Sequence, residues 1–270
     1  MKTRILTAAC LVPVFLGIVY AAPKICTVIL FSVVCAIAAY ELLHSTGFVK
    51  EGRMIAWSVL FAAAVPFWCW FGMPYIWALL AVLAFSCLLF AELLISHAQV
   101  KVNNLCLCYV AAFVIPFMLS ALVRIHMQEK GLYLIMVPLI MAFISDSGAY
   151  FVGRAFGKHK LAPVISPNKT VEGVVGAVFT AVVFMVIYFV VLQYGFFVEV
   201  NYLYAVIYGI VGSLAGVFGD LSFSAIKRST GIKDYGNLMP GHGGVLDRFD
   251  SMVVIAPLAE VLMTLLPVVV

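Results

Sequence analysis

The chain has 270 residues, of which 65% are hydrophobic and 10% are charged, and its net charge is +4 at pH 7. Soluble domains carry about 25% charged residues, so this composition excludes a soluble globular protein and predicts a membrane protein. A net charge this small gives no reason to expect nucleic-acid binding.

Apolar segments of about twenty residues, the length needed to cross a bilayer, recur along the whole chain. The sequence predicts nine such spans, at about 5–22, 25–43, 54–71, 75–95, 105–123, 131–152, 171–194, 202–219 and 251–269. The first could be taken for a signal peptide. However, Pro23 and Lys24 make the position after Ala22 a poor cleavage site, so we expect this span to be retained.

The connections between spans contain no linker, low-complexity tract or repeat. We therefore expect an all-α protein, a polytopic integral membrane helix bundle of about nine transmembrane helices, with cytoplasmic polar loops forming the active site. The expected organisation is a single membrane domain over 1–270, with N-terminal helices in 1–130 and a catalytic half in 131–270.

The basic residues orient this bundle. If the N-terminus is cytoplasmic, only Lys24, Arg124 and Lys130 of the sixteen Lys and Arg residues fall on the outer side. Because cytoplasmic loops carry an excess of Lys and Arg, we expect the N-terminus and the two polar segments of the C-terminal half to face the cytoplasm.

The first polar feature of the C-terminal half is Ser145-Asp-Ser-Gly-Ala-Tyr150, near the end of the sixth span. An acidic residue at that depth is a candidate functional group, although Asp146 could instead form local hydrogen bonds. The next is Ser166-Pro-Asn-Lys-Thr-Val-Glu-Gly173, which reads as a turn followed by a helix start. A helix N-terminus beside Lys169 is suited to bind an anion; the alternative is an interfacial turn with a snorkelling lysine.

The richest polar segment runs from Ser224 to Asp250, between two apolar spans. Its basic residues can neutralise phosphoryl oxygens, and they are Lys227, Arg228, Lys233 and Arg248. Its glycines, Gly241, Gly243 and Gly244, would let backbone N–H groups approach an anion. The alternative is a positively charged cytoplasmic loop without a site.

Three carboxylates flank this segment. Asp220 ends the eighth span, while Asp247 and Asp250 open the ninth and are three residues apart, so both can lie on one side of a helix. Clustered carboxylates at a membrane interface repel one another unless a cation lies between them. We therefore predict Asp220, Asp247 and Asp250 as ligands of Mg²⁺. The alternative for Asp247 and Asp250 is that they cap a helix.

The same residues carry a family resemblance. The pattern Ser-x-x-Lys-Arg, then Lys-Asp, then Pro-Gly-His-Gly-Gly-x-x-Asp-Arg-x-Asp between Ser224 and Asp250 resembles the signature of phosphatidate cytidylyltransferases, also called CDP-diacylglycerol synthases. Ser166–Gly173 resembles the other polar segment of that family, and Ser145–Tyr150 fits as well. Residues 1 to about 130 match only in being hydrophobic.

The resemblance implies an enzyme of phospholipid biosynthesis that converts CTP and phosphatidate to CDP-diacylglycerol and diphosphate with Mg²⁺, within membrane lipids. A second cation and a homodimer stay open. The expected catalytic residues are Asp220, Lys227, Arg228, Asp247, Arg248 and Asp250. The expected substrate-binding residues are Asp146, Ser166, Lys169, Thr170, Glu172, Ser224, Lys233, His242, Gly243 and Gly244. His242 could bind a phosphate or only hold its loop.

We expect a bacterial-type member of this family in the cell (inner) membrane, with several spans and a cytoplasmic active site. One alternative is a CTP-dependent kinase of a polyprenol-type lipid, and another is a transporter of a phosphorylated solute. Outside the motifs, Glu41, Glu92 and Glu260 lie near the ends of predicted spans, where snorkelling would account for them. For Glu41 and Glu92, a role in catalysis is the less favoured alternative.

Overall fold

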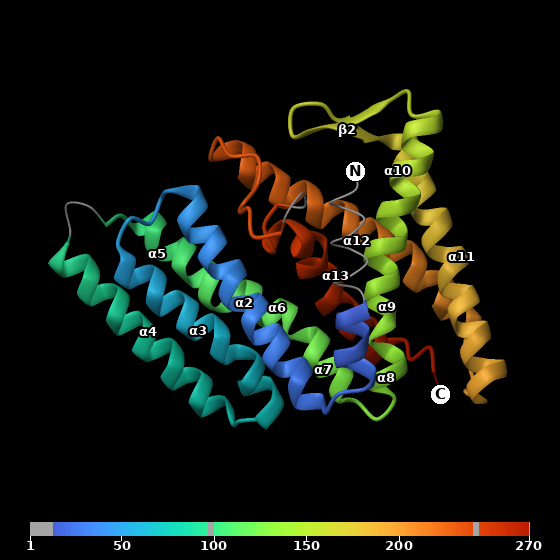
Figure 1. Ribbon diagram of the computed structural model, residues 1–270, viewed down its shortest axis with the longest axis horizontal. Coiled ribbons are helices and arrows are strands. Elements are labelled where there is room, and N and C mark those ends of the chain that lie inside the picture. Colours follow the sequence, from blue (N-terminus) through green and yellow to red (C-terminus); the bar gives the residue numbers. More distant parts are fainter. Residues whose placement is uncertain (1–12, 97–99, 240–242, 270) are drawn as a thin grey trace. The chain divides into compact units, whose positions relative to one another are not determined.

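The computed structural model describes residues 13–96, 100–239 and 243–269 (Figure 1). The chain divides into two compact units. The first consists of 1–127 and 230–249, and the second of 128–229 and 250–270.

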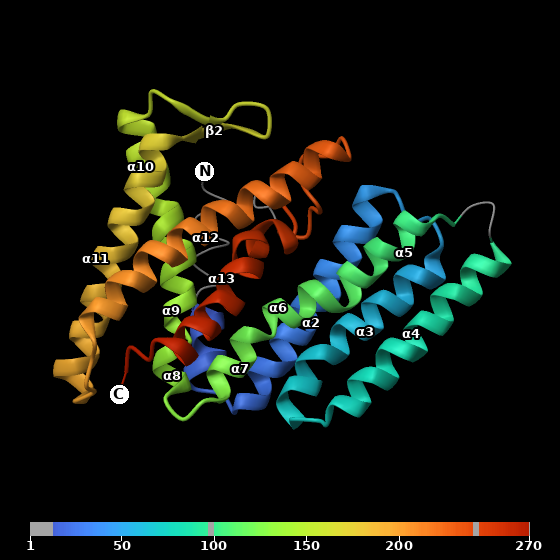
Figure 2. The same ribbon diagram turned by 180° about the vertical axis from the view of Figure 1, so that it is seen from behind.

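The first unit is built from long antiparallel helices. They are α2 (Lys24–Thr46), α3 (Gly52–Phe71), α4 (Tyr75–Ile95) and a continuous helical stretch of α5 (Val102–Tyr109), η1 (Val110–Val114), α6 (Ile115–Leu119) and α7 (Ala121–Met127). Figures 1 and 2 both show α2, α3 and α4 side by side. Gly47 and Gly72, with φ of 67° and 55°, end α2 and α3 in the left-handed conformation that favours glycine. These turns reverse the chain in a few residues.

The second unit begins with α8 (Gly131–Leu134), α9 (Met136–Leu139), η2 (Ile140–Ile144) and α10 (Ser145–Phe156). A hairpin of β1 (Lys160–Ala162) and β2 (Ser166–Thr170) follows, in which Lys160 pairs with Thr170. The chain continues in α11 (Val171–Phe196), α12 (Tyr202–Ser229) and α13 (Leu246–Leu265), whose first four residues belong to the first unit. The hairpin replaces part of the turn that we expected at Ser166–Gly173.

Glycines allow the helices of the second unit to approach closely. A Cβ added at Gly209 of α12 would lie 2.6 Å from Val182 Cα of α11, and one at Gly219 would lie 3.0 Å from Ser251 Cα of α13. Small residues at such crossings are typical of membrane helices, whose backbones pack closely. The crossing at Gly219 brings the next residue, Asp220, to the part of α13 where Asp250 lies.

Among the described residues, seven helices are long and apolar enough to cross a membrane. They are Lys24–Thr46, Gly52–Phe71, Tyr75–Ile95, Val102–Met127, Gly131–Phe156, Val171–Phe196 and Tyr202–Ser229, and they correspond to seven of the nine predicted spans. Much of the predicted span 5–22 lies outside the described residues, and the predicted span 251–269 coincides with α13, which is not one of the seven. The helical membrane class is thus confirmed, whereas nine spans and a single domain stay predictions.

Candidate functional site

The hairpin and the start of α11 are joined by two polar side chains. Thr170 caps α11, because its Oγ1 accepts a hydrogen bond from Gly173 N at 3.1 Å. The Glu172 carboxylate accepts hydrogen bonds from the backbone N–H groups of Lys158 and His159, at 3.1 and 3.2 Å, and His159 Nδ1 lies 2.6 Å from Glu172 Oε1. In this structure Glu172 therefore holds the hairpin against the helix.

A cavity of about 260 Å³ lies beside this junction, within the second unit. Its walls come from α10, β2, α11 and α12, and its lining residues are Asp146, Ala149, Tyr150, Asn168, Lys169, Thr170, Gly173, Val174, Val217 and Asp220. Four predicted residues from three separate segments, Asp146, Lys169, Thr170 and Asp220, thus meet at one cavity. Ser166 and Glu172 are not among its lining residues.

Asp220 is held through both carboxylate oxygens. Its Oδ2 forms an ion pair with Lys169 Nζ at 2.6 Å, and its Oδ1 accepts a hydrogen bond from the Ser224 hydroxyl at 3.1 Å. Ser224 lies one helical turn after Asp220 on α12, so its contact follows from helix geometry. Lys169 comes from β2, and this ion pair therefore joins the hairpin to α12.

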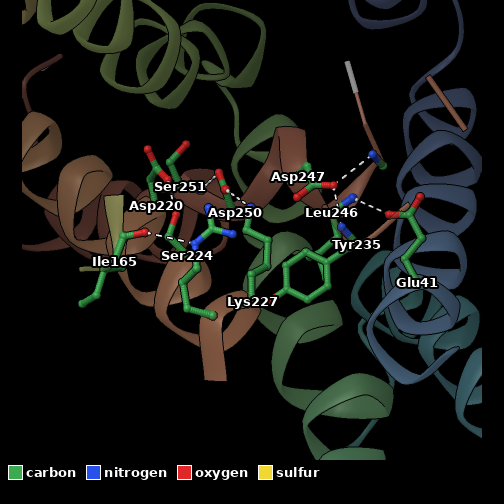
Figure 3. Close-up of polar contacts among 12 residues, drawn as sticks. Glu41, Ile165, Asp220, Ser224, Lys227, Tyr235, Leu246, Asp247, Asp250 and Ser251 are labelled. Carbon is green, nitrogen blue, oxygen red and sulfur yellow. Dashed lines mark hydrogen bonds and ion pairs between the residues drawn. The ribbon is translucent and has the colours of Figure 1, made fainter. Parts of the chain in front are cut away.

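Asp250 is buried in the same unit. Its Oδ1 accepts a hydrogen bond from Ser251 N at 2.7 Å, and Lys227 Nζ lies 3.8 Å from its Oδ2 (Figure 3). The pKa of the Asp250 carboxyl is raised to about 7, chiefly by burial and also by the Asp220 carboxylate, while Lys227 acts in the opposite direction. Two carboxylates that repel each other in a poorly hydrated place are stabilised by a cation.

The donor chemistry of Asp220 and Asp250 fits Mg²⁺, which prefers carboxylate oxygens. Burial is the main cause of the raised pKa of Asp250, and repulsion from the Asp220 carboxylate adds to it, so a cation between the two groups would stabilise the ionised form. Among the residues that the structure describes, no group of three or more His, Cys, Asp or Glu side chains is arranged to hold a metal ion. All three predicted ligands, Asp220, Asp247 and Asp250, stay predictions.

Asp247 is also buried, and its carboxylate contacts backbone N–H groups of the first unit. Its Oδ2 accepts hydrogen bonds from Tyr235 N at 2.8 Å and from Gly244 N at 3.0 Å (Figure 3). Gly243, with φ of 84°, turns the chain in a conformation that only glycine adopts readily. Both donors lie before α13, so Asp247 fastens the preceding residues to the first turn of the helix, and its predicted roles in capping and in metal binding stay open.

The remaining predicted basic residues occupy different settings. Arg228, at the end of α12, donates a hydrogen bond from Nε to Ile165 O at 3.3 Å and so joins α12 to the hairpin. Lys233 and Arg248 are exposed, whereas Lys227 is buried. His242 lies outside the described residues.

Glu41 is a residue whose setting the sequence did not reveal. We expected it to snorkel at the end of a span, but it is buried, with 5% of its surface exposed. Its carboxylate accepts hydrogen bonds from Val245 N at 3.0 Å and from Leu246 N at 2.8 Å, and Figure 3 shows the bond from Leu246. The snorkelling interpretation of Glu41 is therefore wrong. Its partners lie more than two hundred residues along the chain, so no local pattern could have paired them.

Comparison with known proteins agrees with the family resemblance of the polar motifs. Residues 2–266 match the family model described as the cytidylyltransferase family. The chain is 34% identical over 280 residues to the phosphatidate cytidylyltransferase of Bacillus subtilis (strain 168), an alignment that covers 98% of each protein. It is 41% identical over 160 residues to the phosphatidate cytidylyltransferase of Staphylococcus aureus (strain COL), of whose length it spans 58%. The protein of the same name from Staphylococcus haemolyticus (strain JCSC1435) is 40% identical over 160 residues and is also spanned over 58% of its length.

Proposed function

This chain belongs to the cytidylyltransferase family, and we propose that it is a phosphatidate cytidylyltransferase. It would transfer the cytidylyl group of CTP to phosphatidate, producing CDP-diacylglycerol and diphosphate in phospholipid biosynthesis. The observation that carries the proposal is the cavity where Asp146, Lys169, Thr170 and Asp220 meet, because it combines a cation for phosphoryl oxygens with carboxylates for a metal.

Nucleotidyl transfer requires in-line positioning and compensation of the charge on the attacked phosphorus and the departing diphosphate. Lys169 Nζ, on the cavity wall, is available to phosphoryl oxygens if its carboxylate partner Asp220 takes up a cation instead. Lys227, next to Asp250, and Arg228, at the hairpin, would add positive charge on α12. The attacking phosphate of phosphatidate is already anionic near neutral pH, so no strong general base is required.

A Mg²⁺ ion would be held by Asp220 and Asp250, with Asp247 as the third proposed ligand, and would offset charge on the triphosphate. Arg248, Lys233, His242, Gly243 and Gly244 would complete the triphosphate contacts. Ser166 and Glu172 would contribute by fixing the position of the hairpin, and Ser224 would contribute by holding Asp220. The diacyl chains would stay in the bilayer, where exposed apolar side chains of α11 such as Phe179 and Ile187 contact lipid.

The product assay decides between this activity and its alternatives. We expect the purified protein, in detergent with Mg²⁺, radiolabelled CTP and phosphatidate, to form a liponucleotide and diphosphate in equal amounts. Release of CDP with a polyprenol-type alcohol as acceptor would identify a lipid kinase instead. Absence of turnover with either acceptor would favour a transporter of a phosphorylated solute and would overturn the proposal.

We also propose that the protein crosses the cell (inner) membrane several times with its active site towards the cytoplasm, where CTP is found. The support is the distribution of basic residues, of which only three of sixteen would lie on the outer side.

Sidedness can be measured with single cysteines. On a background without native cysteines, cysteines introduced at the exposed positions Lys158 and Lys233 should react with an impermeant maleimide only after the membrane is opened. A cysteine in place of Lys130, on the proposed outer side, serves as the control and should react in intact cells. Labelling of Lys158→Cys or Lys233→Cys in intact cells would contradict this orientation.

A further inference from the structure

The segment before α13 is fastened to α2, and both belong to the first unit. The Ser45 hydroxyl of α2 donates a hydrogen bond to the carbonyl oxygen of Tyr235, while Tyr235 N donates to Asp247 Oδ2. Tyr235 is fully buried, so its backbone is held on both sides in a place that water does not reach. At Tyr235, the described part of this segment is therefore fixed to α2.

Glu41 lies one helical turn before Ser45 on α2 and holds the other end of this segment. Each of its carboxylate oxygens accepts one backbone hydrogen bond, Oε1 from Val245 N and Oε2 from Leu246 N. These N–H groups lie where α13 begins and have no partner within their own helix. An anion at that place is also favoured by the helix dipole.

Two glycines allow the carboxylate to reach this position. A Cβ added at Gly236 would lie 2.4 Å from Glu41 Oε1, and one at Gly244 would lie 2.5 Å from Glu41 Oε2. Real Cβ atoms do not approach so closely, so a side chain at either glycine would displace Glu41. Gly244, which the sequence assigned to a substrate phosphate, thus has a second role against a carboxylate of the protein itself.

We propose that Glu41 is a positioning residue for the proposed cytidylyl transfer, an inference that rests on the function proposed above. By binding Val245 N and Leu246 N, Glu41 sets the place and direction in which α13 starts. The next two residues, Asp247 and Arg248, carry side chains assigned to the reaction, and Asp250 follows one turn later. A carboxylate on α2 would thereby control the geometry of groups that it does not touch.

The substitution Glu41→Gln tests this role, because glutamine has nearly the same shape but only one accepting oxygen. One of the two backbone N–H groups would then face an NH₂ group. We expect kcat to fall at least tenfold, about 1.4 kcal/mol, with a change in KM for CTP of less than about threefold, because the groups on α13 would be misplaced for the transition state. Hydrogen exchange of the amides of Val245 and Leu246 should accelerate by about tenfold or more.

Glu92→Gln is the matched control. Glu92 is another buried carboxylate of the first unit, but it pairs with Arg53 at 2.9 Å between α3 and α4. Glu92→Gln should leave kcat, and the hydrogen exchange of the Val245 and Leu246 amides, near the parental values. A second variant, Gly236→Ala, should reproduce the effects of Glu41→Gln by displacing the carboxylate, and it keeps the inference testable if Glu41→Gln does not fold.

The outcomes separate this inference from the proposed function. Unchanged exchange at Val245 and Leu246 in a folded Glu41→Gln or Gly236→Ala protein would overturn the positioning role, as would an equal loss of kcat in Glu92→Gln. Accelerated exchange with unchanged kcat would also overturn it. If the parental protein forms no CDP-diacylglycerol, the proposed function fails, whereas the exchange result still reports whether Glu41 holds the start of α13.

Discussion

Asp247→Asn is expected to reduce turnover at least a hundredfold, about 2.7 kcal/mol, while the protein stays folded. The reason is that asparagine preserves one of the two roles that Asp247 could have. Its side-chain oxygen can still accept the hydrogen bonds from Tyr235 N and Gly244 N that Asp247 Oδ2 accepts. The negative charge that a Mg²⁺ ion or a triphosphate-bound cation requires is lost.

Asp247→Ala supplies the comparison. Alanine removes both the accepting oxygen and the charge, and loss of a hydrogen bond to a charged group costs about 2 kcal/mol of stability. We expect both variants to be inactive in initial-rate assays at saturating Mg²⁺, and only Asp247→Ala to unfold at a lower temperature. An active Asp247→Asn beside an inactive Asp247→Ala would mean that Asp247 has a structural role alone.

Asp220→Asn is expected to have an effect of similar size, again at least about a hundredfold in turnover. The substitution leaves an oxygen that can accept the hydrogen bond from Ser224, but it removes the ion pair of 2.6 Å with Lys169. It also leaves Asp250 as the remaining carboxylate of the pair proposed to bind Mg²⁺. Because both partners of that ion pair are partly exposed, we expect little change in stability. Glu199→Gln, at an exposed position between α11 and α12, is the control and should keep the parental rate.

A double-mutant cycle with Lys169→Gln shows what Asp220 does. If Asp220 only holds Lys169 in place, the double variant should be no slower than Lys169→Gln alone, because contacting residues that act as one unit are not additive. A metal-binding role predicts a further loss in the double variant. Equal rates for Lys169→Gln and the double variant would therefore contradict Asp220 as a ligand.

The polar motif around Thr170 shows which structural elements a local sequence pattern can predict and which it cannot. Thr170 and the residues after it were expected to begin a helix near Lys169, and Thr170 does cap α11. The same pattern did not predict the hairpin, because its strand β1 has three residues and is stabilised by pairing with β2 and by Glu172, which is fourteen residues from Lys158. Short strands of this kind depend on contacts that a window of sequence does not contain.

Hydrophobic length and charge pattern, which are local properties, were enough to predict a helical membrane protein and seven of its long helices. The spacing of polar residues was enough to indicate the family to which the chain belongs. Tertiary structure alone decided the partners of the carboxylates: Asp220 with Lys169, Asp250 with Lys227, and Glu41 with the start of α13. The physical reason is that the local sequence around a carboxylate does not show which donors will contact it in the folded protein. Its role depends on which donor the packing of distant helices brings to it, and here glycines without side chains allow that approach.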